Sequence, residues 1–304
     1  MSWLLFSFSG PVMWALSTHI DKYLVERYFK HGRVAVLLIF TALIDIAVLP
    51  FIGYYRPDAA APGHEHIPLI ILAGVLYMGA MHFYLGALRN EEASVVGAYF
   101  QATPLFGGLL AYLFLGETLT TRQLGGGALI VAGAALVSFQ FRKRHGRFKP
   151  QLLLLMLACT FTIAVSSVIF NIFAIKADFW TTAFWTYTGE ILYGIGLLTI
   201  GSVRREFAAS LRANTGAILS VNAINELINF GGTLGARYAL LLAPLGMVQA
   251  IGSTTPLLVF LFGVLITLFL PKLGRENLAP ANLLQKGVAS LLVVGGVILV
   301  SIGV

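Results

Sequence analysis

Charged side chains are scarce in this chain of 304 residues. Asp, Glu, Lys and Arg together fill 11% of the positions, whereas a soluble domain carries roughly 25%. So few charges cannot cover a water-facing surface, and hydrophobic residues make up 58% of the sequence, with a mean hydropathy of +0.86. The composition therefore predicts an all-α membrane protein, because backbone exposed to lipid must form its hydrogen bonds within its own segment.

Cysteines and catalytic motifs are also missing. The single cysteine, Cys159, lies in an apolar stretch, so neither a disulfide framework nor a cysteine metal site is expected. The sequence contains no HExxH, GxSxG or P-loop motif, and its connecting loops leave no room for a soluble catalytic domain. We therefore predict that the chain is not an enzyme and holds no cofactor or metal.

Positive charge is confined to short loops, although the formal net charge is +7. Counted from the N-terminus, the odd-numbered connections between apolar segments hold 16 of the 20 Lys and Arg residues. Basic residues beside apolar segments mark cytoplasmic loops, so we expect no nucleic-acid partner. The count predicts a multi-pass protein of the inner (cytoplasmic) membrane with both termini outside the cytoplasm. No signal peptide is expected, since residues 1–9 lack a basic region.

Long apolar stretches separate these charged loops. A membrane-spanning helix needs about 20 mostly apolar residues, and Pro residues inside such a helix usually mark bends. The sequence predicts ten spans, at 3–20, 35–55, 67–87, 94–115, 123–140, 151–173, 180–200, 216–238, 245–270 and 285–303.

The two halves of the chain repeat each other. A shift of 152 residues aligns Thr103–Leu105 with Thr255–Leu257, and after a ten-residue insertion a shift of 162 pairs Gly133 with Gly295. Five helices per repeat is an odd number, so the halves must cross the membrane in opposite senses, as in many transporters. The predicted units are a first repeat at 1–141, a basic connecting loop at 142–150 and a second repeat at 151–304.

One segment carries a family resemblance. Residues 87–137 combine a mid-helix Pro104, the turn Gly116-Glu117 followed by Leu119-Thr120, then Gln123 and a Gly-rich last helix. This segment resembles the EamA-type repeat of the drug/metabolite transporter superfamily. The resemblance implies a ten-helix carrier whose cargo is an amino acid, a sugar phosphate, a nucleotide sugar, a cation or a lipid-linked molecule. Many such families keep both termini in the cytoplasm, the opposite of the charge count.

Polar residues recur on one face of the eighth span. Asn222, Glu226, Asn229, Thr233 and Arg237 are spaced by three or four residues, which places them on one side of a helix. Such a stripe predicts the wall of a polar cavity; the alternative is a ladder of interhelical hydrogen bonds. In the third span, Tyr77 and Tyr84 are seven residues apart and are predicted to form an aromatic wall opposite it; the alternative is that they pack against other helices with their hydroxyls hydrogen-bonded.

Two further acids occupy matched positions. Thr41 and Asp45 in the second span correspond to Thr186 and Glu190 in the seventh. A carboxylate within the bilayer is costly and usually functional, and one that exchanges a proton suits proton coupling. We predict Glu226, Glu190 and Asp45 as proton-coupling residues, the alternative being structural acids bonded to neighbouring helices.

The remaining candidate substrate contacts come from three spans. Gln101, in the fourth span, pairs with Ser253 across the repeat, and Gln249 lies one turn before Ser253. Trp14 in the first span is a candidate aromatic contact, with a packing role as the alternative.

These features predict a secondary transporter that exports a small metabolite, with amino acids favoured, by proton-coupled alternating access. A flippase or carrier for a lipid-linked phosphate or nucleotide sugar is the alternative, and a non-transporting sensor or scaffold is the alternative of another class. The expected partners are a small-molecule substrate and the lipid bilayer. Small residues at Gly125 and Gly133 permit close helix packing, in a monomer or a homodimer.

Overall fold

The computed structural model describes residues 2–30, 32–61, 65–115, 120–140, 147–176, 179–242, 251–252, 254–271, 273–274 and 276–301. Almost all of these residues are helical. One antiparallel pair of two-residue strands, β1 (Phe139–Gln140) and β2 (Arg147–Phe148), stands at the connection between the two halves. The prediction of an all-helical membrane protein is confirmed.

The helices follow the predicted spans. The first half contains α1 (Ser2–Tyr28), α2 (Val34–Tyr55), η1 (Pro57–Ala60), α3 (Ile67–Asn90), α4 (Ala93–Tyr99), η2 (Phe100–Ala102), α5 (Thr103–Leu115) and α6 (Thr121–Ser138). The second half contains α7 (Pro150–Lys176), α8 (Phe179–Leu198), α9 (Gly201–Ala213), α10 (Thr215–Leu242), α12 (Thr255–Phe269) and α13 (Pro280–Ser301). In the described part of the chain, four stretches are both long and apolar enough to cross a membrane, namely Val34–Tyr55, Ile67–Asn90, Pro150–Phe170 and Pro280–Leu299.

The fourth span is broken where Pro104 predicts a bend. Helix α4 ends at Tyr99, the chain passes through the short 3₁₀ helix η2, and α5 begins at Thr103. Proline lacks the backbone N–H that a continuous helix needs, so the break falls on the residues just before it. In the second half, α12 likewise begins at Thr255, immediately before Pro256.

Helix α9 is absent from the sequence prediction, which treated residues 201–215 as a loop. The helix buries Val203 and carries Arg204, Arg205 and Arg212. Its Phe207 ring lies 5.3 Å from the ring of Phe40 on α2. A search for long apolar stretches misses such a helix, because only one of its faces is apolar.

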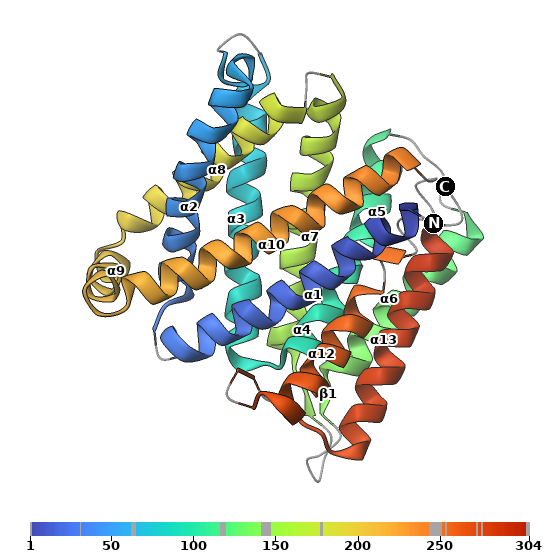
Figure 1. The fold of residues 1–304 in the computed structure, drawn as a ribbon. Helices are drawn as coiled ribbons and strands as arrows, with labels where there is room; N and C mark the ends of the chain where they lie inside the picture. The colour runs from blue at the N-terminus through green and yellow to red at the C-terminus, as the bar shows by residue number, and fades with distance from the viewer. Residues whose placement is uncertain are drawn as a thin grey trace.

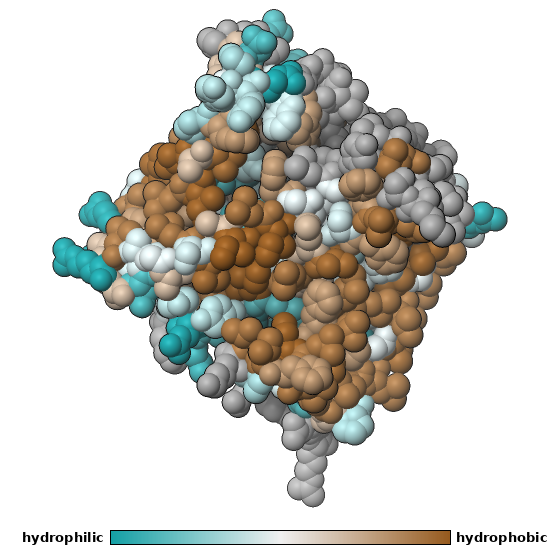
Figure 2. Space-filling view, in the orientation of Figure 1, coloured by the Kyte–Doolittle hydropathy of each residue, from teal (hydrophilic) through white to brown (hydrophobic). Residues whose placement is uncertain are grey.

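The helices gather their connections at two ends of the molecule. In Figure 1, the connections after α1, α3, α6, α8 and α12 lie toward the lower left, and we call this the odd-loop end. The C-terminal ends of α2, α7 and α10 lie toward the opposite side, together with the start of α1. Figure 2 shows hydrophobic side chains covering the face formed by α1, α10, α12 and α13 between these ends.

Small residues allow the principal helix pairs to approach closely. Helices α1 and α10 run antiparallel across the front of Figure 1, where Gly232 of α10 faces Met13 and Trp14 of α1. On α6, a side chain at Gly133 would collide with Val293 and with the backbone of Ala289 on α13. Backbone contact of this kind is typical of helices packed within membranes.

Candidate functional site

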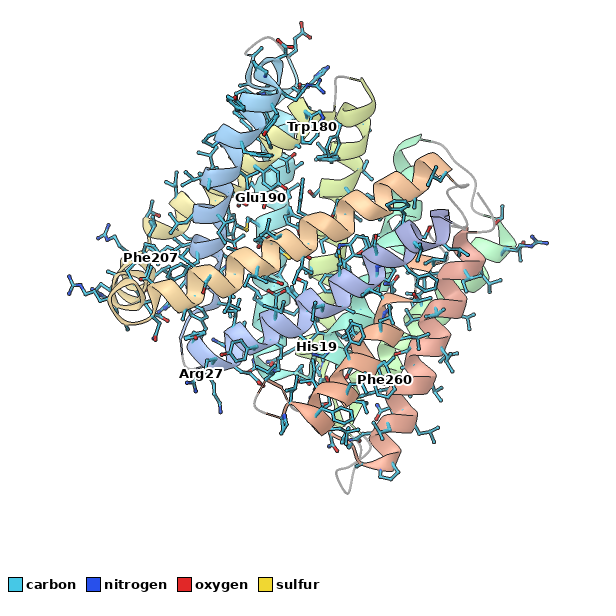
Figure 3. All side chains as sticks on the ribbon, viewed as in Figure 1. His19, Arg27, Trp180, Glu190, Phe207 and Phe260 are labelled. Carbon is cyan, nitrogen blue, oxygen red and sulfur yellow. The ribbon has the colours of Figure 1, made fainter. Side chains whose placement is uncertain are left out.

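Three carboxylates from three helices converge inside the molecule. Asp45 of α2 and Glu190 of α8 are buried, with exposed fractions of 3% and 6%, and Glu226 of α10 is half-buried. Glu190 lies close enough to both Asp45 and Glu226 to interact with them electrostatically, and Figure 3 shows Glu190 on α8 among the surrounding helices. The two acids from matched sequence positions and the acid of the polar stripe therefore lie in one neighbourhood, which we call the acid cluster.

A hydroxyl joins two residues of the predicted polar stripe. The side-chain amide of Asn222 on α10 donates a 3.0 Å hydrogen bond to the hydroxyl of Thr41 on α2. The same hydroxyl is hydrogen-bonded to Glu226. Among the described residues, Oδ2 of the buried Asp45 has no hydrogen-bond partner. An unsatisfied buried oxygen is costly, so this oxygen is available to bind a proton or to accept a hydrogen bond.

Tyr77 lies beside the acid cluster. It is 37% exposed, although Ala73, Gly74 and Tyr84 on the same face of α3 are buried. Glu190 and Glu226 both act electrostatically on its hydroxyl. Tyr77 is therefore a partly exposed residue on an otherwise buried part of α3, within electrostatic reach of two of the three acids.

Tyr84 serves a different group from Tyr77. Its hydroxyl donates a 2.9 Å hydrogen bond to Oδ2 of Asp21 on α1, and the amide of Asn225 on α10 donates a 2.7 Å bond to Oδ1. Asp21 is not among the candidate site residues predicted from the sequence. Trp14, Thr18 and Asp21 are spaced by four and three residues, which places them on one helical face, and this spacing is the signal that could have indicated it.

The other predicted substrate contacts in the described residues lie on α1, η2 and α10. Trp14 lies over Gly232 in the contact between α1 and α10, Gln101 lies in η2 at the break of the fourth span, and Asn229 is half-buried on α10. Gln249, Ser253 and the side chain of Arg237 lie outside the described residues, so these predictions stay untested. In the described part of the chain, no group of three His, Cys, Asp or Glu side chains is arranged to hold a metal ion.

The acid cluster lies beside two helix–helix contacts that differ in how closely the helices pack. The predicted repeat equates the pair α3–α8 with the pair α10–α2, yet α3 packs extensively against α8 whereas α10 contacts α2 much less. At the α3–α8 crossing, a side chain at Gly74 would collide with the carbonyl oxygen of Thr186, and one at Gly189 with that of Ile71. The residue equivalent to Gly74 in the second half is Glu226. The second contact therefore carries an acid where the first carries a glycine.

A buried ionic cluster joins the two halves at the odd-loop end. Glu276, in the connection after α12, accepts hydrogen bonds from the hydroxyl and backbone N–H of Ser94 on α4, at 2.6 and 3.1 Å. Lys286 of α13 donates to Glu276 at 2.5 Å and also to Glu92. We call Glu92, Ser94, Glu276 and Lys286 the inter-repeat lock.

The two acids of the lock differ in proton affinity. Burial and the hydrogen bond with Glu92 raise the pKa of Glu276 to about 7, against the opposing attraction of Lys286. For Glu92, burial also favours the neutral form, but its hydrogen bonds with Glu276 and Lys286 and the charge of Lys286 together lower the pKa. Glu276 is therefore the group of the lock whose charge changes near neutral pH.

Further hydrogen bonds and ion pairs connect helices at the odd-loop end. The ammonium of Lys22 donates to the carbonyl oxygens of Leu88 and Glu91, each at 2.7 Å, and Lys149 forms a 2.6 Å ion pair with Glu91. These contacts tie α1 and the start of α7 to the C-terminal end of α3. They use the basic residues that the charge count assigned to the odd-numbered loops.

The sequence can now be compared with known proteins. Residues 1–139 match the pattern that defines the EamA-like transporter family. The first half of this chain is an EamA-like unit. This match confirms the family resemblance, and together with the apolar helices it identifies a multi-pass membrane protein.

Two curated relatives match parts of this chain. A protein of Streptantibioticus cattleyicolor named as a probable terminal-alkyne amino-acid exporter is 31% identical over 103 residues, which span 34% of this chain and 33% of that protein. An uncharacterized transporter of Clostridium kluyveri is 23% identical over 145 residues, 47% of this chain and 46% of its own. The matches thus cover less than half of either relative. One solved structure superimposes with a TM-score of 0.49 at 18% identity, over 98% of this chain and 96% of its own.

Proposed function

We propose that this protein is a secondary transporter that exports a small metabolite, in the amino-acid class, in exchange for protons. The observation that carries the proposal is the acid cluster, in which Asp45, Glu190 and Glu226 come from helices of both halves and interact with one another. Like charges so close together do not ionise independently. Such a group can therefore take up a proton on one side of the membrane and release it on the other.

The unequal helix contacts support alternating access. In an inverted repeat, two equivalent contacts that differ in closeness correspond to one of two interchangeable arrangements. Here the odd-loop end is held by the inter-repeat lock, while the contact between α2 and α10 is the looser one. Release of the lock, with closure of α2 on α10, would produce the opposite arrangement.

The amino-acid class follows from similarity and from the walls of the site. The relative from Streptantibioticus cattleyicolor is named as an amino-acid exporter, and Tyr77 with Asn222 gives this site both aromatic and amide groups. A carrier of lipid-linked phosphate would need cationic side chains around the site. Among the described residues, Lys22 instead binds carbonyl oxygens at the odd-loop end.

Proton-coupled flux in liposomes tests the proposal. Purified protein is reconstituted with a pH-sensitive dye inside the vesicles, and a proton gradient is applied in the presence of individual L-amino acids. We expect wild-type protein to couple the movement of at least one amino acid to proton movement. In the Glu226→Gln variant, we expect the rate of this coupled transport to be at least tenfold lower. Glu206→Gln is the matched control, because Glu206 lies on α9 with its carboxylate paired to Arg33. Full coupled flux in the Glu226→Gln variant would contradict the assignment.

A further inference from the structure

Asp21 anchors a second polar group, distinct from the acid cluster. Its two carboxylate oxygens each accept one hydrogen bond, from Asn225 of α10 at 2.7 Å and from Tyr84 of α3 at 2.9 Å. A carboxylate offers about four acceptor positions, so Asp21 retains capacity for further donors. Asp21 is half-buried, and it acts electrostatically on Tyr77, which also lies beside the acid cluster.

Asn225 leaves one oxygen unsatisfied beside this carboxylate. The residue is 1% exposed, yet its Oδ1 has no hydrogen-bond partner among the described residues. The NH₂ group of the amide faces the carboxylate of Asp21, and this turns Oδ1 of Asn225 away from it. Because an unpaired buried acceptor is costly, the oxygen points to a donor that the protein itself does not supply.

The basic residues nearest to Asp21 in sequence are directed elsewhere. Lys22 donates to two carbonyl oxygens and pairs with Glu26 at 3.1 Å, and His19 hydrogen-bonds the carbonyl of Val259 at 2.8 Å. Another acid, Glu226, interacts electrostatically with Asp21. The site therefore combines a carboxyl group, a buried amide oxygen without a partner among the described residues and a second acid nearby.

From this arrangement we infer that Asp21, Asn225 and Tyr84 bind the protonated amino group of the cargo. An ammonium group supplies three donors, which match the free positions on Asp21 and the Oδ1 atom of Asn225. The Tyr84 and Phe100 rings lie 5.0 Å apart beside the site and offer an apolar wall for the rest of the molecule. The inference deepens the proposed function and rests on it, naming a primary amine as the recognised group.

Calorimetric titration of the detergent-purified protein tests this site by binding alone. The probes are phenethylamine, L-phenylalanine, N-acetylphenethylamine and 3-phenylpropanoate, of which the first two carry a protonated amine. We expect the two amines to bind wild-type protein and the two probes without an amine to bind at least 30-fold more weakly. Equal affinity for phenethylamine and its N-acetyl derivative, or no binding of either amine, overturns the inference.

Three variants assign the binding to these residues. We expect Asp21→Asn to lower the affinity for phenethylamine at least tenfold. Tyr84→Phe, which keeps the ring, should lower the same affinity about fivefold. Asp58→Asn is the matched control, because Asp58 is exposed in η1, and its affinity should equal that of wild type. Unchanged affinity in Asp21→Asn overturns the inference, and the Tyr84→Phe result decides in the same way if Asp21→Asn does not fold.

This experiment separates the amine site from the proposed function. Amine binding without proton-coupled flux would leave the site standing and remove the transport proposal. Coupled flux of an amino acid without amine binding would support the transport proposal and remove the amine site.

Discussion

The pair α3–α8 and the pair α2–α10 are equivalent in the predicted repeat and differ in construction. Gly74 and Gly189 let the backbones of α3 and α8 meet, whereas the equivalent positions on α10 and α2 carry Glu226 and Ile44. A glycine removes the side chain that would hold two helices apart, and a larger side chain at the same place keeps them apart. The difference teaches that a few residues at the crossing points decide how closely two equivalent helix pairs pack.

The largest expected effect comes from breaking the close contact. Gly74→Ala places a methyl group against the Thr186 carbonyl oxygen and the Glu190 backbone nitrogen, so α3 and α8 must separate. We expect a loss of about 3 kcal/mol in stability, measured by thermal unfolding in detergent. Gly86→Ala on the same helix is the control, because nothing lies within 4 Å of its added methyl. Equal stability of the two variants would show that the glycine contact is not essential.

The second effect concerns the inter-repeat lock at the odd-loop end. The pKa of Glu276, at about 7, is higher than its ordinary value of 4.5, so the folded protein binds a proton that the unfolded chain releases. This contribution to stability is full below pH 4.5 and is lost as the pH rises through 7. We expect Glu276→Gln to remove a pH-dependent component of up to about 3 kcal/mol between pH 5 and pH 8.

Unfolding measured across this pH range in wild type and variant provides the check. Glu92 works in the opposite sense, because its lowered pKa gives stability that is present above its ordinary value and lost as the pH falls further. The Glu92→Gln variant is therefore the control for the sign of the change. A Glu276→Gln curve parallel to wild type from pH 5 to pH 8 would exclude Glu276 as the titrating group.

Most of the fold could be predicted from the sequence, because lipid requires long apolar helices and the repeat fixes their order. Helix α9 could not, since its apolar face is carried by few residues such as Val203 and Phe207. Two acids of the acid cluster, Asp45 and Glu190, could be predicted from matched positions, and Glu226 from its polar stripe, but their convergence could not. The inter-repeat lock was not, because Ser94 and Glu276 are 182 residues apart and nothing local in either loop indicates the partner.

Asp21 shows a second limit of sequence reasoning. A residue next to Lys22 near the end of an apolar stretch resembles the membrane surface in any hydropathy pattern. The structure instead turns Lys22 toward the carbonyls of Leu88 and Glu91, and this leaves Asp21 facing Tyr84 and Asn225. Side chains one position apart on a helix point about 100° away from each other, so their environments can differ completely.

The third prediction tests whether the looser contact leaves the site open to water. In a Cys159→Ala background, Tyr77→Cys should react with a water-soluble thiol reagent at least tenfold faster than Met78→Cys. Tyr77 is 37% exposed and Met78 is fully buried, although the two residues are adjacent on α3. Similar labelling rates, followed by mass spectrometry, would mean that the space beside Tyr77 is closed to solvent.

The smallest effect is expected where an ion pair at the odd-loop end lies in water. The Arg33 Nε and Glu206 Oε2 atoms are 3.9 Å apart, and their side chains are 55% and 30% exposed. Exposed pairs of this kind contribute roughly 0–1 kcal/mol, so Arg33→Gln should change stability by less than about 0.5 kcal/mol. The Glu206 carboxylate also accepts the backbone N–H of Arg33 at 2.7 Å, a contact that this substitution leaves in place. A loss as large as that of Gly74→Ala would mean that these exposed charges contribute as much to stability as the close glycine contact does.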